Sequence, residues 1–80
     1  MVTVADLLPG QIGVITDFDD ALLPIKLLEL GCLPGNAVEL VQVAPLKDPI
    51  YINLSGTHIA IRRVLANQIP VEIVDNNPTL

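Results

Sequence analysis

Residues 50–62, Ile-Tyr-Ile-Asn-Leu-Ser-Gly-Thr-His-Ile-Ala-Ile-Arg, decide the fold, because apolar and polar side chains alternate on both sides of a short turn. Such alternation is typical of strands with one face on a core and one face in water. The Ser55-Gly56 pair predicts the tight turn of a hairpin. The apolar positions predicted to face the core are Ile50, Ile52, Leu54, Ile59 and Ile61.

The other face of this hairpin mixes an aromatic side chain with hydrogen-bonding groups. Its predicted members are Tyr51, Asn53, His58 and Arg62. Mixtures of this kind are found on protein recognition surfaces. An ordinary solvated sheet face explains the same pattern, so both interpretations stay open.

Three further strands are predicted outside the hairpin. Residues 11–18 place Ile12, Val14 and Phe18 on one face, and the last strand turns Ile69, Val71 and Ile73 inward. Along residues 37–44 the apolar parity slips by one, which indicates a bulge or a strand bent around a barrel corner. Five short strands in 80 residues favour a small barrel. The pattern leaves SH3-like and OB-like barrels both open.

One short helix is predicted over residues 22–30, between the first and second strands. Pro24 falls in its first turn, where proline is tolerated, and Gly31 ends it. The apolar positions sweep more than half of the helix circumference. A domain this small covers about one side of a helix, so the remainder meets either a neighbouring loop or a partner.

Composition excludes several classes of partner and location. The net charge of −5 disfavours nucleic acid and anionic lipid surfaces. Charged residues interrupt every apolar segment, so no membrane insertion is expected. The first residues lack the basic start and apolar run of a signal peptide, and the single cysteine fits a reducing compartment. We therefore expect a cytoplasmic protein.

The chain offers few groups for chemistry, and no catalytic residue or cofactor is predicted. Cys32 and His58 lie in a predicted turn and a predicted strand, no glycine-rich phosphate loop is present, and the spacings of a zinc site are absent. The carboxylates of Asp17, Asp19 and Asp20 are explained by helix capping, and a hard-cation site is the alternative interpretation. Metal ligands stay unknown, and docking onto a partner is the favoured function.

Four strings then give the chain a resemblance to a known family. They are Leu27-Leu28-Glu29-Leu30-Gly31, Leu33-Pro34-Gly35, Ala44-Pro45-Leu46-Lys47-Asp48-Pro49-Ile50 and Ile61-Arg62-Arg63. In this order and spacing the chain closely resembles the FeoA family, from residue 8 through residue 71.

This resemblance implies a mainly β, SH3-like barrel of about five strands with one short helix between the first and second. Residues 1–74 would form a single domain, followed by a polar tail over residues 75–80. The function it implies is that of a cytoplasmic accessory protein of ferrous iron uptake. Such a protein binds the cytosolic, GTPase-bearing part of the FeoB transporter and carries no catalytic residues. Self-association is left open.

Two positions depart from the family pattern. Lys47 stands where relatives usually carry glycine, and a lysine forced to positive φ costs about 1 to 2 kcal/mol. Lys26 stands where many members carry arginine, which keeps the charge but loses the planar fork. The residues predicted to touch the partner are Ile25, Lys26, Leu28, Lys47, Tyr51 and Arg62. The alternative hypothesis is a carrier or sensor that binds ferrous iron directly.

Overall fold

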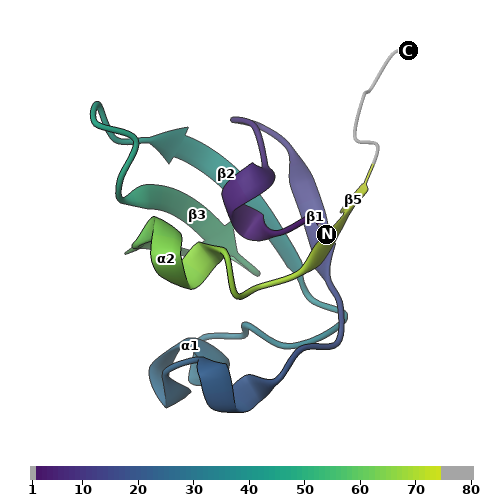
Figure 1. The fold of residues 1–80 in the computed structure, drawn as a ribbon. Coiled ribbons are helices and arrows are strands. Elements are labelled where there is room, and N and C mark those ends of the chain that lie inside the picture. Colours follow the sequence, from purple (N-terminus) through teal and green to yellow (C-terminus); the bar gives the residue numbers. More distant parts are fainter. Residues whose placement is uncertain (1, 75–80) are drawn as a thin grey trace.

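A computed structural model describes residues 2–74 of the chain as one five-stranded antiparallel sheet (Figure 1). The strands lie in the order β4-β3-β2-β1-β5. Their bounds are β1 Ile12–Ile15, β2 Ala37–Val43, β3 Ile50–Leu54, β4 Thr57–Ile61 and β5 Val71–Val74. The short helices are η1 Val4–Asp6, η2 Asp20–Leu22, α1 Ile25–Glu29 and α2 Arg63–Ala66. The mainly β fold, with a helix between the first and second strands, is confirmed, and the tail predicted over residues 75–80 lies outside the described residues.

The β3–β4 hairpin forms as predicted from its alternation. Leu54 pairs with Thr57 across a loop of two residues, in which Ser55 has φ 52° and Gly56 has φ 97°. Two positive φ values are the signature of a type I′ turn, whose twist matches that of the flanking strands. The side chain of Asn53 accepts the Gly56 N–H at 2.8 Å and fixes the loop.

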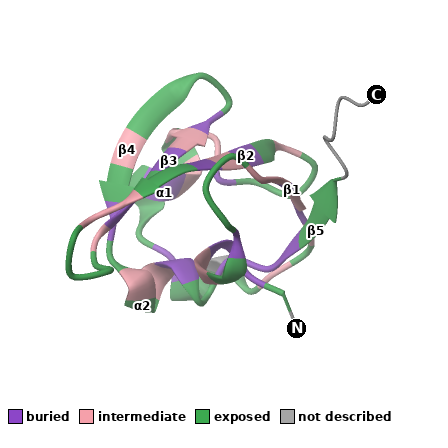
Figure 2. Ribbon diagram, turned by 90° about the horizontal axis from the view of Figure 1, so that it is seen from above, coloured by how far each residue is buried: buried purple, intermediate pink, exposed green. Residues whose placement is uncertain are grey.

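A bulge in β2 curls the sheet, as the parity slip predicted. The pairing of β2 with β3 shifts between Leu40 and Gln42, so Val41 is the extra residue. An extra residue bends its strand and increases the local twist. Seen from above, the sheet wraps around its buried residues (Figure 2).

The core is aliphatic and lies on the concave side of the sheet, where η1 and α2 contact each other (Figure 1). Residues 20–32, which include η2 and α1 and are called the α1 segment below, lie at one end of the strands. They join this core through Leu23, Leu27 and Cys32. The buried apolar residues are Val4, Leu7, Ile15, Leu23, Leu27, Cys32, Val38, Leu40, Ile50, Ile52, Leu54, Ile61, Ala66, Ile69 and Val71.

The first strand buries the face opposite to the one on which Ile12 and Val14 lie. Gly13 and Ile15 are buried, whereas Ile12 and Val14 are half-buried on the opposite face. A β-carbon added to Gly13 would lie 2.8 Å from the β-carbon of Val71, so the missing side chain lets β5 pack closely. Alternation of apolar side chains does not indicate that a glycine faces the core.

The helices also differ from the sequence prediction. Residues 22–30 do not form one helix, because Pro24 has extended backbone angles (φ −58°, ψ 139°) and separates η2 from α1. Helix α2 was not predicted. Its first N–H donates to Asp48, which is 15 residues away in sequence, so no local capping residue marks its start. Ile73, predicted to face inward, is 45% exposed near the end of the edge strand β5.

Candidate docking surface

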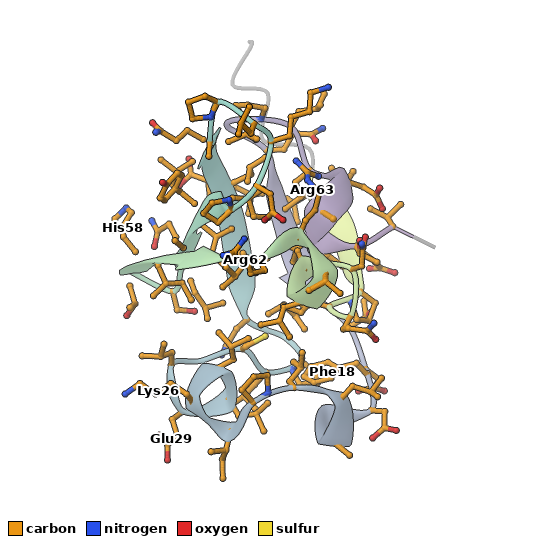
Figure 3. All side chains as sticks on the ribbon, turned by 60° about the vertical axis from the view of Figure 1, so that its left-hand side comes forward. Phe18, Lys26, Glu29, His58, Arg62 and Arg63 are labelled. Carbon is orange, nitrogen blue, oxygen red and sulfur yellow. The ribbon has the colours of Figure 1, made fainter. Side chains whose placement is uncertain are left out.

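The α1 segment carries three of the six residues predicted to touch a partner. Ile25 is 72% exposed, Lys26 is exposed, and both project from the short helix at the end of the molecule (Figure 3 labels Lys26). Leu28 is half-buried and packs against the core. Leu22, on the preceding η2, is 55% exposed. The exposed apolar side chains at this end of the molecule are therefore Ile25 on α1 and Leu22 on η2, whereas Leu28 contributes to the core.

The proline-containing loop over residues 44–49 has a defined shape. Lys47 has φ 71°, so the position does require the left-handed region that suits glycine. The Lys47 N–H donates to the Ala44 carbonyl at 2.7 Å, and the Ala44 N–H donates to the Pro49 carbonyl at 3.1 Å. The Asp48–Pro49 peptide is cis. These contacts hold the Lys47 side chain on an exposed, closed turn.

Arg63 connects this loop to the rest of the domain, a role that its place in the sequence does not indicate. Its Nε donates to the Lys47 carbonyl at 2.8 Å and its Nη1 donates to the Ala5 carbonyl at 3.0 Å. Its backbone N–H donates to Asp48 Oδ1 at 2.9 Å. Arg63, the first residue of α2, thereby holds the loop through its backbone and side chain, and its side chain also reaches η1.

Tyr51 and Arg62 were both predicted on the outer face of the hairpin, but only Tyr51, on β3, lies within a strand of it. Tyr51 pairs with Ala60 on the outer face of the sheet and is 37% exposed, and Asn53 pairs with His58 beside it. Arg62 is exposed but lies beyond the strand, as the residue before α2. A shallow hollow of about 220 Å³ is lined by Val41, Tyr51, Ile52, His58, Ile59 and Ala60.

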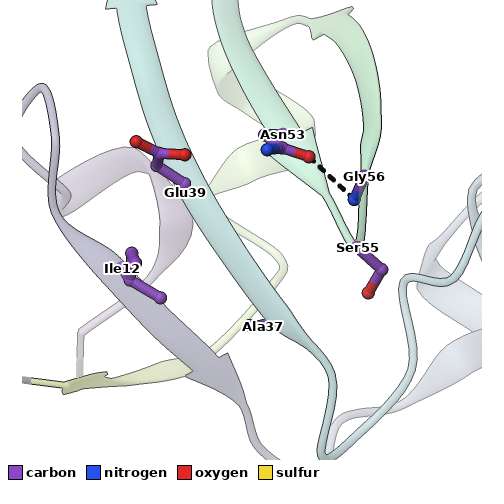
Figure 4. A pocket seen from close by; sticks show the side chains of 6 residues that line it. All are labelled: Ile12, Ala37, Glu39, Asn53, Ser55 and Gly56. Carbon is purple, nitrogen blue, oxygen red and sulfur yellow. Dashed lines mark hydrogen bonds between the residues drawn. The ribbon is translucent and has the colours of Figure 1, made fainter.

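A second hollow on the outer face crosses β1, β2 and the hairpin loop (Figure 4). It measures about 140 Å³, and Glu39 is the one ionisable group among its lining residues, which also include Ile12, Ala37, Asn53, Ser55 and Gly56. A single carboxylate in an open hollow supplies neither a nucleophile with a base nor a metal-ligand set.

The six predicted residues do not converge on one site. The α1 segment lies at one end of the sheet, whereas the loop that carries Lys47 lies at the other (Figure 1). Tyr51 lies on the outer sheet face between them. The three locations are separate candidates for contact with a partner, and their role stays a prediction.

The two groups best suited to chemistry, the Cys32 thiol and the His58 imidazole, lie in different environments in the described structure. Cys32 is buried, and burial raises the pKa of its thiol to about 11, so the reactive thiolate is scarce at neutral pH. His58 is exposed on β4. Within residues 2–74, no cluster of three or more histidine, cysteine or carboxylate side chains could hold a metal ion. In the same range, every helix is too short to cross a bilayer.

Similarity to known proteins agrees with the motifs quoted above. The protein-family model of the FeoA domain matches residues 2–73 of this chain. A fusion protein of Fe(2+) transport protein A and Fe(2+) transporter FeoB from Porphyromonas gingivalis (strain ATCC BAA-308 / W83) is 37% identical over 54 residues. That match covers 68% of this chain and 6% of the fusion protein, so the chain spans a small part of its curated relative.

Solved structures of similar proteins share the fold. The solution structure of iron(II) transport protein A from Clostridium thermocellum superposes with a TM-score of 0.80 at 34% identity, covering 91% of this chain and 46% of that one. The crystal structure of Stenotrophomonas maltophilia FeoA, described as an SH3 domain protein in complex with zinc, gives 0.75 at 26% identity, covering 90% and 91%. The five-stranded sheet is thus an SH3-like fold, and the chain belongs to the FeoA family.

Proposed function

We propose that this protein is a cytoplasmic accessory protein of ferrous iron uptake, which binds the cytosolic, GTPase-bearing part of an FeoB-type transporter. The observation that carries the proposal is the fused relative, in which an FeoA part and an FeoB part belong to one polypeptide. Fusion keeps two modules at a high effective concentration without a strong interface. The two parts of that relative are thus positioned to act on each other, which supports a contact between an FeoA domain and an FeoB-type transporter.

The α1 segment is the surface best suited to that contact. Ile25 and Leu22 expose apolar side chains three residues apart, and apolar anchors of this kind dominate the energy of many protein interfaces. Lys26 adds a charge beside them. Since Ile25 is exposed and lies outside the core, its substitution tests binding with little effect on folding.

The test is a titration of the labelled protein with the transporter's cytosolic domain, in the absence of nucleotide and with GDP or a non-hydrolysable GTP analogue. We expect saturable binding in at least one nucleotide state. Ile25→Asp should weaken it by about tenfold or more, because a charge replaces an apolar anchor. Leu8→Asp is the matched control, since Leu8 is also an exposed leucine-sized side chain at 63% exposure, but it precedes the Pro9-Gly10 turn.

Two results would contradict the proposal in different ways. Absence of binding in all nucleotide states removes the transporter as the partner. Equal loss of affinity in Ile25→Asp and Leu8→Asp, or none in either, keeps the partner but removes α1 as the contact. Circular dichroism of both variants confirms that the fold is retained.

A further inference from the structure

Strand β4 is an edge of the sheet, and its free side presents backbone hydrogen-bonding groups. The two-residue loop makes Leu54 and Thr57 a hydrogen-bonded pair, and such pairs alternate along an antiparallel ladder. His58 and Ala60 therefore direct their N–H and C=O groups away from β3. The β2 side agrees, because Leu40 exchanges backbone bonds with Gly10 and Gln11, which leaves its partner Ile52 to bond β4.

This edge lacks the devices by which proteins usually block pairing with another strand. Thr57–Ile61 contains no lysine, proline or bulge, and its register with β3 runs unbroken over five residue pairs. No other segment of residues 2–74 pairs with its outer side. Thr57, His58 and Ala60 are exposed, and the hollow beside Tyr51 adjoins them.

The charged residues at the C-terminal end of β4 are mostly cationic, although the protein as a whole is acidic. All nine carboxylates of the chain lie outside residues 49–71, a segment that contains Arg62 and Arg63. The bond from Arg63 to the Lys47 carbonyl brings a third cationic residue to the end of β4. Asp48, the nearest carboxylate in sequence, accepts the Arg63 N–H. β4 is thus an unblocked edge strand with cationic residues at its C-terminal end, in a protein that is acidic as a whole.

From this combination we propose that β4 accepts an extended, acidic segment of the protein's partner, which adds to the sheet as a sixth strand. Main-chain bonds to His58 and Ala60 would hold the segment, and the cations at the end of β4 would select a negatively charged one. The inference rests on the proposed function for the partner's identity. It adds the mode of binding and the chemistry of the bound segment.

Amide hydrogen exchange measured by NMR tests this mode directly. We expect exchange at the His58 and Ala60 amides to slow by about tenfold or more when the transporter's cytosolic domain is added, because both gain a hydrogen bond. Ala60→Pro removes one outward N–H without removing a bond to β3, and it should weaken binding by about tenfold. Ala60→Val, which keeps the N–H and suits a strand, is the matched control and should bind like the natural protein.

The charge requirement has its own variants. Arg62→Glu should weaken binding by about fivefold or more and reduce its salt dependence. The affinity of Arg62→Gln should lie between those of the natural protein and Arg62→Glu. Thermal unfolding of each variant reports whether the fold is intact.

The outcomes separate this inference from the proposed function. If the complex forms but both amides exchange as in the free protein and Ala60→Pro binds normally, strand addition is refuted while the partner stands. If no complex forms, both are refuted. If the two amides become protected in the isolated protein as its concentration rises, the occupant is a second copy, and the acidic partner segment is refuted.

Discussion

Substitution of Arg63 by alanine is expected to destabilise the domain more than the substitution of an ordinary surface arginine would. The change removes two side-chain hydrogen bonds from a charged donor, to the carbonyls of Lys47 and Ala5. A hydrogen bond from a charged group contributes about 1.5 to 3 kcal/mol, and an ordinary one contributes about 0.5 to 1.5 kcal/mol. We assign about 1.5 kcal/mol to the part-buried bond to Ala5 and about 0.5 kcal/mol to the exposed bond to Lys47. We expect a loss of about 2 kcal/mol in the free energy of unfolding, or about 8 to 16 °C in Tm.

The neighbouring arginine supplies the control. Arg62 is exposed and precedes α2 without a side-chain bond in the described structure, so Arg62→Ala should change the free energy of unfolding by less than about 0.5 kcal/mol. Arg63→Lys keeps the charge but cannot span both carbonyls, so it should lose about half as much as Arg63→Ala. Urea unfolding followed by far-UV circular dichroism measures all three. Equal stability of Arg63→Ala and Arg62→Ala would refute the role assigned to Arg63.

Three further outcomes follow from single residues. Lys47→Gly should raise the free energy of unfolding by about 0.5 to 1 kcal/mol, because it relieves positive φ at some cost in unfolded-chain entropy, whereas Lys47→Ala should give no such gain in the same urea assay. Gly13→Ala should cost about 1 to 3 kcal/mol in the same assay, since its β-carbon would lie 2.8 Å from the β-carbon of Val71. Adding Val71→Ala should leave most of this loss in place, because alanine keeps that β-carbon and removes only the γ-carbons. Burial raises the pKa of Cys32 from 9.0 to about 11, so the unfolded state releases the thiol proton first. Stability is therefore expected to fall between about pH 9 and 11, and a Cys32→Ala variant should show a smaller fall over that range in urea titrations.

The hairpin and the bulge could be predicted because each is specified by local pattern. Alternation in residues 50–61 fixes which side chains are buried, and the slip of parity near Val41 marks the extra residue. The inward position of Gly13 could not be predicted in this way, because its reason is the approach of Val71, 58 residues later. Helix α2 escaped prediction for the same reason, since its N-terminus is capped by a side chain from a distant loop.

The candidate sites were harder to predict than the fold, because sequence gives residue types but not which of them share a surface. Ile25, Leu28 and Lys26 were correctly placed on one helix, yet packing divides them between core and solvent. The two adjacent arginines looked alike in sequence, and only the three-dimensional position of Lys47 separates a structural Arg63 from an exposed Arg62.

The edge position proposed for partner binding follows from the order of the strands and is not specified by any single side chain. An edge strand is defined by the order of strands in the sheet, and the order β4-β3-β2-β1-β5 leaves the hairpin's second strand on the outside. The residues of β4 are selected to bury Ile61 and half-bury Ile59, so the strand is required by the core whether or not it binds anything. What the core does not require is that this edge lacks a blocking residue and that the carboxylates lie elsewhere in the chain. Folding requires neither of these two features, because both concern the solvent-exposed side of the strand. We therefore relate them to the proposed partner strand.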